Sequence, residues 1–143
     1  MNSKTRMSKR LQSLGLLICA AVLAGCAGAP NGAVPEQTVE ERAQERWNFI
    51  VAREYGEAWN YQTPAFRQST SREDFAFDMV RRRVRWTDAV VSGAECEGDR
   101  CEVAVTVSYT PVGGPSQFRD MVLSRDRTET WIRLEGQWWH VQN

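Results

Sequence analysis

Histidine is nearly absent from this chain, since His140 is the only one among its 143 residues. The cysteines of "CEGDRC" (Cys96 and Cys101) lack the second pair of ligands that a structural zinc site requires. The sequence also contains no phosphate-binding loop, no nucleophile elbow and no pair of carboxylates on an apolar face. We therefore expect no metal and no cofactor, and these absences argue against acid–base and nucleophilic catalysis.

Long apolar segments are scarce as well. The main one, residues 11–24, is shorter than the roughly 20 apolar residues that a membrane-spanning helix needs. It follows "MNSKTRMSKR", which contains four basic residues and no acidic one. A basic segment before a short apolar one is typical of a secretory signal peptide, so the sequence predicts an exported protein.

The apolar segment ends in "LAGC" (Leu23 to Cys26), which resembles the lipobox of bacterial lipoproteins. In that family the cysteine is acylated with diacylglycerol, and the signal peptide is cut immediately before it. The resemblance implies a signal peptide over residues 1–25 and a membrane anchor at Cys26, where two or more acyl chains give stable binding. Ala27 replaces the aspartate that often retains such proteins at the inner membrane, so the resemblance implies an outer-membrane protein facing the periplasm. The alternative is an ordinary cleaved signal peptide with an incidental cysteine.

Basic charge is not in excess. Residues 1–25 hold four of the 18 basic residues and none of the 18 acidic ones, so the chain from Cys26 onward has a net charge of −4. Because a nucleic-acid-binding protein should show a basic surplus, nucleic acid is not an expected partner. Residues 26–36 are rich in alanine, glycine and proline and read as a lipidated tether, which leaves one domain over residues 37–143.

The first part of this domain is predicted to be helical. Apolar residues recur at steps of three and four at Val39, Ala43, Trp47, Ile50, Val51, Tyr55, Ala58 and Trp59. Gly56 predicts a break near residues 53–56, followed by a second short helix through Tyr61. Thr63 before Pro64 is a further start signal for a helix.

A third long helical segment is predicted after Ser71. Ser71 followed by Asp74 is a relaxed capping box, and the run "RRRVR" (residues 81–85) lies at the end of the helix, where the helix dipole favours cations. The run reads as a solvated helix end, with a contact to anionic lipid head groups as the alternative.

An antiparallel hairpin is predicted next. Residues 101–109 alternate between apolar and polar side chains, which is typical of a strand with one buried face. Residues 87–96 form its partner, and the four residues "EGDR" form the loop between them. This register places Cys96 opposite Cys101, with Cα atoms ~4.5–5.5 Å apart, which suits a disulfide in an oxidising compartment.

A second hairpin is predicted from residues 118–134 and 137–141, with Glu135 and Gly136 as its turn. The register opposes Trp131 to His140, Ile132 to Trp139 and Arg133 to Trp138. We assign one face of this hairpin to the core, namely Ile132, Leu134, Trp139 and Val141. The opposite face is expected to be exposed and carries Trp131, Arg133, Trp138 and His140.

The predicted order is helices followed by a meander of strands, with "RWNFIVAREYGEAWNYQTPAFR" early and "TETWIRLEGQWWHV" late. Over residues 37–142 this arrangement resembles the nuclear transport factor 2-like superfamily. The resemblance implies an α+β fold in which three N-terminal helices pack on a curved antiparallel sheet of about four strands, shaped like a cone. The superfamily includes isomerases, dehydratases and non-catalytic modules, so the fold does not decide the function.

We expect a lipid-anchored, non-catalytic binding or assembly module of the cell envelope. The predicted exposed patch would suit a homodimer or an envelope protein partner. The resemblance leaves two alternatives: an isomerase or dehydratase acting in the cone, and a structural component of a secretion machine. Candidate lining residues for a pocket that takes a small apolar ligand are Tyr55, Trp59, Tyr61 and Tyr109.

Overall fold

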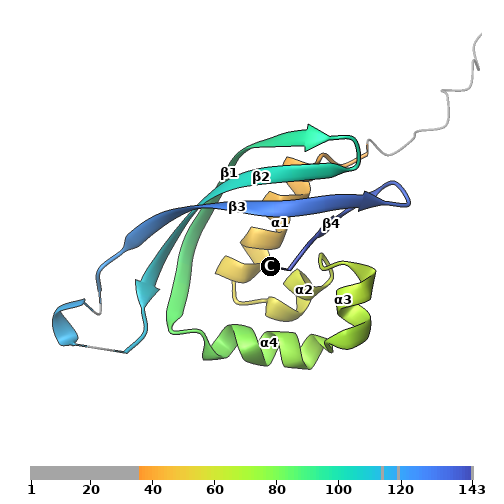
Figure 1. Ribbon diagram of the computed structural model, residues 1–143. Coiled ribbons are helices and arrows are strands. Elements are labelled where there is room, and N and C mark those ends of the chain that lie inside the picture. Colours follow the sequence, from red (N-terminus) through yellow and green to blue (C-terminus); the bar gives the residue numbers. More distant parts are fainter. Residues whose placement is uncertain (1–35, 114, 119, 143) are drawn as a thin grey trace, which may run out of the picture. The chain divides into compact units, whose positions relative to one another are not determined.

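The structure is a computed structural model that describes residues 36–113, 115–118 and 120–142 (Figure 1). The predicted signal peptide, Cys26 and nearly all of the tether lie outside the described residues. Within the described ranges, no helix is long and apolar enough to cross a membrane.

Four helices precede the sheet, rather than the three predicted. They are α1 (Val39–Val51), α2 (Tyr55–Trp59), α3 (Pro64–Ser69) and α4 (Arg72–Arg81). The additional helix is α3, which begins at the predicted start signal: the backbone N–H of Phe66 donates to the Thr63 hydroxyl at 3.3 Å, and Pro64 occupies the first turn. Ser71 caps α4 by accepting from the backbone N–H of Asp74, also as predicted.

The break after α1 falls where the sequence predicts it, but Gly56 is not its cause. Arg53 adopts a φ of 66°, in the left-handed region that ends a helix. Gly56 instead lies inside α2, where a Cβ atom would come within 2.5 Å of the Arg72 side chain. Glycine at this position therefore leaves room for the Arg72 side chain beside α2.

The strands form one antiparallel sheet in chain order, which confirms the predicted α+β class. They are β1 (Val84–Glu97), β2 (Arg100–Pro111), β3 (Leu123–Leu134) and β4 (Gln137–His140). Register shifts between Trp86 and Asp88 and between Val91 and Gly93 increase the bend of β1. The sheet curls into half a barrel, with α1 against its concave face (Figure 1).

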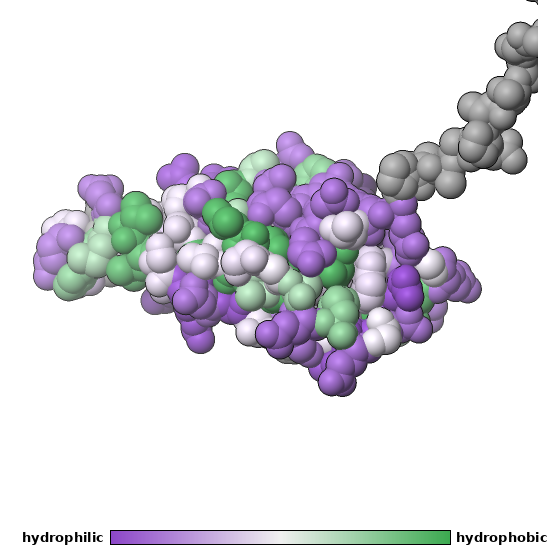
Figure 2. All heavy atoms as spheres, turned by 90° about the horizontal axis from the view of Figure 1, so that it is seen from above, coloured by the Kyte–Doolittle hydropathy of each residue, from purple (hydrophilic) through white to green (hydrophobic). Residues whose placement is uncertain are grey.

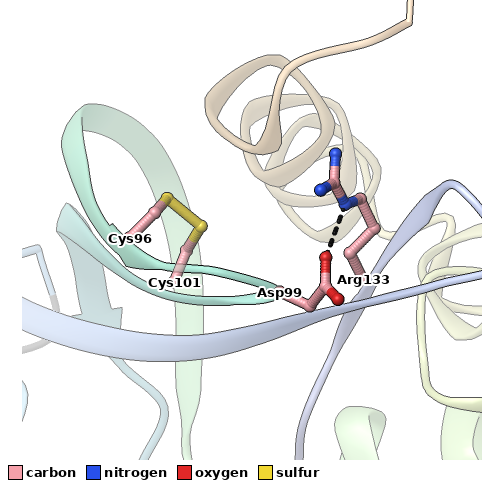
Figure 3. The surroundings of a disulfide bond; sticks show 4 residues. All are labelled: Cys96, Asp99, Cys101 and Arg133. Carbon is pink, nitrogen blue, oxygen red and sulfur yellow. Dashed lines mark hydrogen bonds and ion pairs between the residues drawn. A yellow bond between two sulfur atoms is a disulfide. The ribbon is translucent and has the colours of Figure 1, made fainter.

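The first hairpin contains the predicted disulfide. Cys96 pairs directly with Cys101, and their Cα atoms lie 4.0 Å apart (Figure 3). The loop is shorter than predicted, because Glu97 and Arg100 also pair and only two residues form the turn. At this end of the sheet Arg133 Nε donates to the Asp99 carboxylate at 2.9 Å.

The second hairpin has the predicted register but the opposite face in the core. Trp131 pairs with His140 and Arg133 with Trp138, across a turn whose two residues both have positive φ. Trp131 is 0% exposed and His140 is 6% exposed, whereas Leu134 is 42% exposed. The assignment of Ile132, Leu134, Trp139 and Val141 to the core was therefore wrong.

Pairing with β2 explains which face is buried. Trp131 lies opposite Cys101 and Glu129 lies opposite Val103. Directly paired residues share a face of the sheet, so Trp131 joins the buried row of β2 that the helices cover. That row consists of Cys101, Val103, Val105 and Val107, as predicted.

The space-filling view from above the sheet is largely hydrophilic (Figure 2). Apolar side chains are visible in this view along the middle of the face and at the end that holds the connection between β2 and β3, which includes the short helix η1 (Ser116–Phe118). The exposed apolar residues of this connection and its flanks are Val112, Phe118, Met121 and Val122.

Candidate functional site

A small polar cavity lies between α1 and the concave face of the sheet. It has a volume of about 50 Å³, space for a few water molecules or one small group. We call it the polar cavity; its lining residues are Arg46, Trp47, Ile50, Met79, Arg82, Trp86, Arg127, Thr128, Glu129, His140, Val141 and Gln142.

A buried ion pair forms one wall of the polar cavity. Arg46 Nη1 lies 3.3 Å and 3.5 Å from the two carboxylate oxygens of Glu129, and both side chains are almost fully buried. Arg46 belongs to the buried stripe of α1, and Glu129 faces inward from β3. Because each charge is removed from water, loss of either partner would leave the other uncompensated.

His140 is held next to this pair. Its Nδ1 lies 3.0 Å from Gln62 Oε1, and its Nε2 lies 3.8 Å from the Glu129 carboxylate, too far for a hydrogen bond. The Gln62 amide can accept from this nitrogen when Nδ1 carries the ring proton. The backbone is fixed as well, since His140 N–H donates to Tyr61 O and His140 O accepts from Thr63 N–H.

Burial, followed by the charges of Arg46 and Arg127, lowers the pKa of His140 well below its usual value of 6.5. The imidazole is therefore neutral at pH 7. A lower pKa also makes Nε2 a weaker base than an ordinary histidine, which does not suit proton abstraction near neutral pH.

Guanidinium groups gather around the two tryptophans of the cavity wall. Those of Arg46 and Arg127 lie 5.6 Å and 5.8 Å from the Trp47 ring, and that of Arg82 lies 6.0 Å from the Trp86 ring. At these distances the faces of the rings attract cations. Arg46 is buried against Trp47, whereas Arg82 and Arg127 are exposed and cover these rings from the solvent side of the cavity wall.

The four candidate pocket residues do not line the polar cavity. Tyr55 and Tyr61 are buried in the core, while Trp59 and Tyr109 pack at its edge. Tyr61 contacts the Phe49 ring, with ring centroids 5.9 Å apart, because it follows the short helix α2 beneath α1. These residues fill space between elements.

The predicted exposed patch is also absent from the surface. Trp131, Trp138 and His140 are buried by the helices, and only Arg133 is partly exposed, where it pairs with Asp99 and Glu36. His140 is the one member of this set that reaches the polar cavity. The expectation that the four residues form an aromatic interface was therefore wrong.

No feature of the sequence was assigned to a site for Arg46, Gln62, Arg127 and Glu129. Arg82 belongs to the run 81–85 that the sequence places at a solvated helix end, and it is exposed there, at the C-cap of α4. One signal was available for Arg46, which lies three residues after Ala43 and four before Ile50 on the apolar stripe of α1. A charged residue at such a position implies a buried partner. Nothing local to Gln62 indicates that it meets His140, and nothing local to Arg127 indicates that it lies at the cavity wall.

The described ranges contain no group of three or more histidine, cysteine, aspartate or glutamate side chains that could hold a metal ion. Glu129 and His140 are the only two such residues on the wall of the polar cavity. The chemistry available there is therefore that of guanidinium groups, one carboxylate and one neutral imidazole.

No family model matches the chain, and no curated protein matches it. Among solved structures it is similar to a SEC-C motif containing protein from Rhodopseudomonas palustris, at 15% identity and a TM-score of 0.57, over 75% of this chain and 77% of that one. It is also similar to a SEC-C motif containing protein from Psychrobacter arcticus, at 12% identity and a TM-score of 0.57, over 78% of this chain and 63% of that one. At such identities the similarity supports the fold alone, and membership of the nuclear transport factor 2-like superfamily stays a prediction.

Proposed function

We propose that this protein is a non-catalytic binding or assembly module of the cell envelope, anchored to the membrane through Cys26. The observation that carries the non-catalytic part is the small size of the polar cavity between α1 and the sheet. Trp47, Trp86 and Trp131 are buried there, and a volume of about 50 Å³ remains, far below the 300–1,000 Å³ of ordinary ligand pockets. A steroid-sized substrate has no room in such a cavity.

The groups that would do acid–base chemistry are also engaged. Glu129 is paired with Arg46, and Nδ1 of His140 lies 3.0 Å from Gln62 Oε1. The charged wall does not suit the small apolar ligand that the sequence suggested. These contacts support a structural role for the ion pair and the histidine.

An enzyme of the isomerase or dehydratase type is the second candidate, and one observation favours it. His140 lies on the inner face of the sheet, beside Glu129 and at a cavity wall, where a base of such an enzyme would have to be. The lowered pKa of His140 and the small cavity weigh against it.

Turnover measurements separate the two candidates. The full chain and its His140→Gln variant are incubated in D₂O with small enolisable ketones, and exchange of the α-protons is followed by NMR. We expect no exchange above the buffer rate for either protein. Exchange by the unmodified chain that His140→Gln abolishes would overturn the non-catalytic proposal.

The anchor is tested by metabolic labelling with an alkyne-bearing palmitate in a Gram-negative host. We expect label on the unmodified protein, because "LAGC" follows a basic segment. We expect its recovery in the outer-membrane fraction, because Ala27 stands where an aspartate would retain it at the inner membrane. Cys26→Ser should remove the label, whereas Cys19→Ser, which changes another cysteine within the predicted signal peptide, should keep it. Equal labelling of the two variants would contradict the assignment of Cys26.

A further inference from the structure

Exposed apolar side chains are concentrated on α4 and on the connection between β2 and β3. Of the eight large apolar side chains that are exposed among the described residues, six belong to these segments and their flanks: Phe77, Val80, Val112, Phe118, Met121 and Val122. The other two, Val90 and Leu134, lie on β1 and at the far end of β3. A single exposed apolar residue is ordinary, whereas a group of them marks a surface that binds a partner.

The two segments lie at the same end of the molecule. The backbone carbonyl of Arg83, just after α4, accepts a hydrogen bond from the backbone N–H of Val112 at 2.9 Å. The contact continues into the sheet, where Val84 pairs with Pro111. In Figure 1 the connection between β2 and β3 lies at the end of the molecule where α4 leads into β1.

This end, residues 77–85 and 110–125, also has a surplus of positive charge, and we call it the basic apolar end. Its described residues include five arginines and two aspartates, a net charge of +3, whereas the chain from Cys26 onward has a net charge of −4. All five arginine side chains are exposed: Arg81, Arg82, Arg83, Arg85 and Arg125. Basic and apolar groups are interleaved, since the Arg81 guanidinium lies 5.3 Å from the centroid of the Phe77 ring.

From these observations we infer that the basic apolar end binds the surface of an anionic phospholipid bilayer. Arginines near such a surface are attracted by its acidic head groups, and exposed apolar side chains enter the boundary between head groups and acyl chains. The charge favours a bilayer over a second copy of this chain, because two copies that met through this end would bring like charges together.

The inference rests on the proposed function only for the nearness of a membrane. The chain from Cys26 to Glu36 spans at most about 35 Å when it is fully extended, so a lipid at Cys26 would keep the domain within reach of the bilayer. The basic apolar end would then give the anchored domain a second contact and a fixed orientation on the membrane.

The test is hydrogen exchange of the backbone amides, measured by mass spectrometry on the full chain with an excess of vesicles. The vesicles consist of phosphatidylcholine alone or with about one third phosphatidylglycerol, at low ionic strength. We expect exchange over residues 110–125 to be slowed at least about threefold on the anionic vesicles and to be unchanged on the neutral ones. Equal exchange on the two kinds of vesicle would overturn the inference.

Two further outcomes are distinguishable. Slowing that occurs without vesicles and increases with protein concentration would show that a second copy covers this end, and would also overturn the inference. The anchor is judged separately, because palmitate labelling reports on Cys26 and the exchange reports on residues 110–125. Slowing on anionic vesicles by a chain without palmitate would support this inference and contradict the anchor.

Matched arginine variants show whether the basic apolar end is responsible. Arg83→Gln with Arg85→Gln should lower the equilibrium constant for the contact roughly fivefold per arginine and so remove most of the slowing. Arg100→Gln with Arg133→Gln makes the same change at the opposite end of β2 and β3, and should leave the slowing unchanged. Equal loss in the two double variants would indicate general ionic attraction and would contradict the inference.

The apolar contribution is tested in the same way. Val122→Ser removes an exposed apolar side chain just before β3, whereas Leu134→Ser removes one at the other end of that strand. We expect Val122→Ser to weaken the slowing at least about twofold and Leu134→Ser to leave it unchanged. Slowing that neither variant changes would show that apolar side chains do not enter the bilayer, which would overturn that part of the inference.

Discussion

In the hairpin formed by β3 and β4, the face that carries polar residues is buried, and the more apolar face is the more exposed one. The buried face holds Glu129 and His140 beside Trp131, while the other face leaves Leu134 exposed. The polar groups are tolerated inside because each has a partner: Arg46 for Glu129 and Gln62 for His140. The comparison teaches that the strands paired alongside and the helix packed above decide which face of a hairpin is buried.

The largest difference is expected when tryptophans on the two faces are compared. Trp131→Ala should destabilise the fold by ~3–5 kcal/mol, because it removes a fully buried indole and leaves a void. Trp139→Ala, in the neighbouring strand, should cost about half as much, since Trp139 is half-buried between Arg42 and Arg67. Urea denaturation of the full chain measures both, and a larger loss for Trp139→Ala would contradict the assignment of faces.

The ion pair gives the next largest effect. Glu129→Gln should cost about 3 kcal/mol, because Arg46 would stay buried without a carboxylate. Glu102→Gln makes the same change in a carboxylate that pairs with Arg100 in contact with solvent, and should cost less than about 1 kcal/mol. Thermal unfolding of the two variants compares them directly. If Glu129→Gln unfolds at the temperature of the unmodified chain, Arg46 is not buried as described.

The disulfide should contribute about 2 kcal/mol, because it closes a loop of only a few residues. Replacing both cysteines, as Cys96→Ala with Cys101→Ala, should lower stability by that amount while the hairpin keeps its register. Urea denaturation with and without reductant gives the measurement. An effect of reductant on the double variant would show that the loss does not come from this bond.

Acid should weaken the buried face through His140. Its pKa is lowered in the folded state, so the unfolded chain binds the proton more tightly and stability falls as pH drops below 6.5. The loss should be roughly 1 kcal/mol per pH unit from pH 6.5 to 5. A hydrogen bond from Gln37 lowers the pKa of the Glu45 carboxyl. Glu45 therefore adds to the loss of stability only when the pH falls below its usual pKa of 4.5. His140→Gln should abolish the pH dependence of the free energy of unfolding between pH 6.5 and 5. An unchanged dependence in this variant would show that other groups cause it.

The parts of the fold that depend on local chemistry could be predicted from the sequence. Thr63 and Ser71 start helices, Cys96 pairs with Cys101, and Glu135 with Gly136 forms the tight turn that sets the last register. In each case the residues that interact are close in the chain, so the pattern contains the information.

The buried face and the polar cavity depend on pairs that are distant in the chain. Trp131 is buried because it lies opposite Cys101, and the site needs Arg46 to meet Glu129 and Gln62 to meet His140. The turn at Glu135 fixes the register of the hairpin but not which side the helices cover. Polarity then gave the wrong answer, because a paired charge can be buried where an unpaired one cannot.

The central claim is that His140 is a buried, neutral residue at the wall of the small polar cavity. The most direct test is NMR of the His140 ring carbon signals in the full chain from pH 8 to 5, where the only histidine is unambiguous. The account predicts no titration step in this range while the protein stays folded, because burial and the charges of Arg46 and Arg127 lower the pKa of the ring. A titration midpoint near 6.5 in the folded protein would contradict it, since it would require a solvent-exposed imidazole.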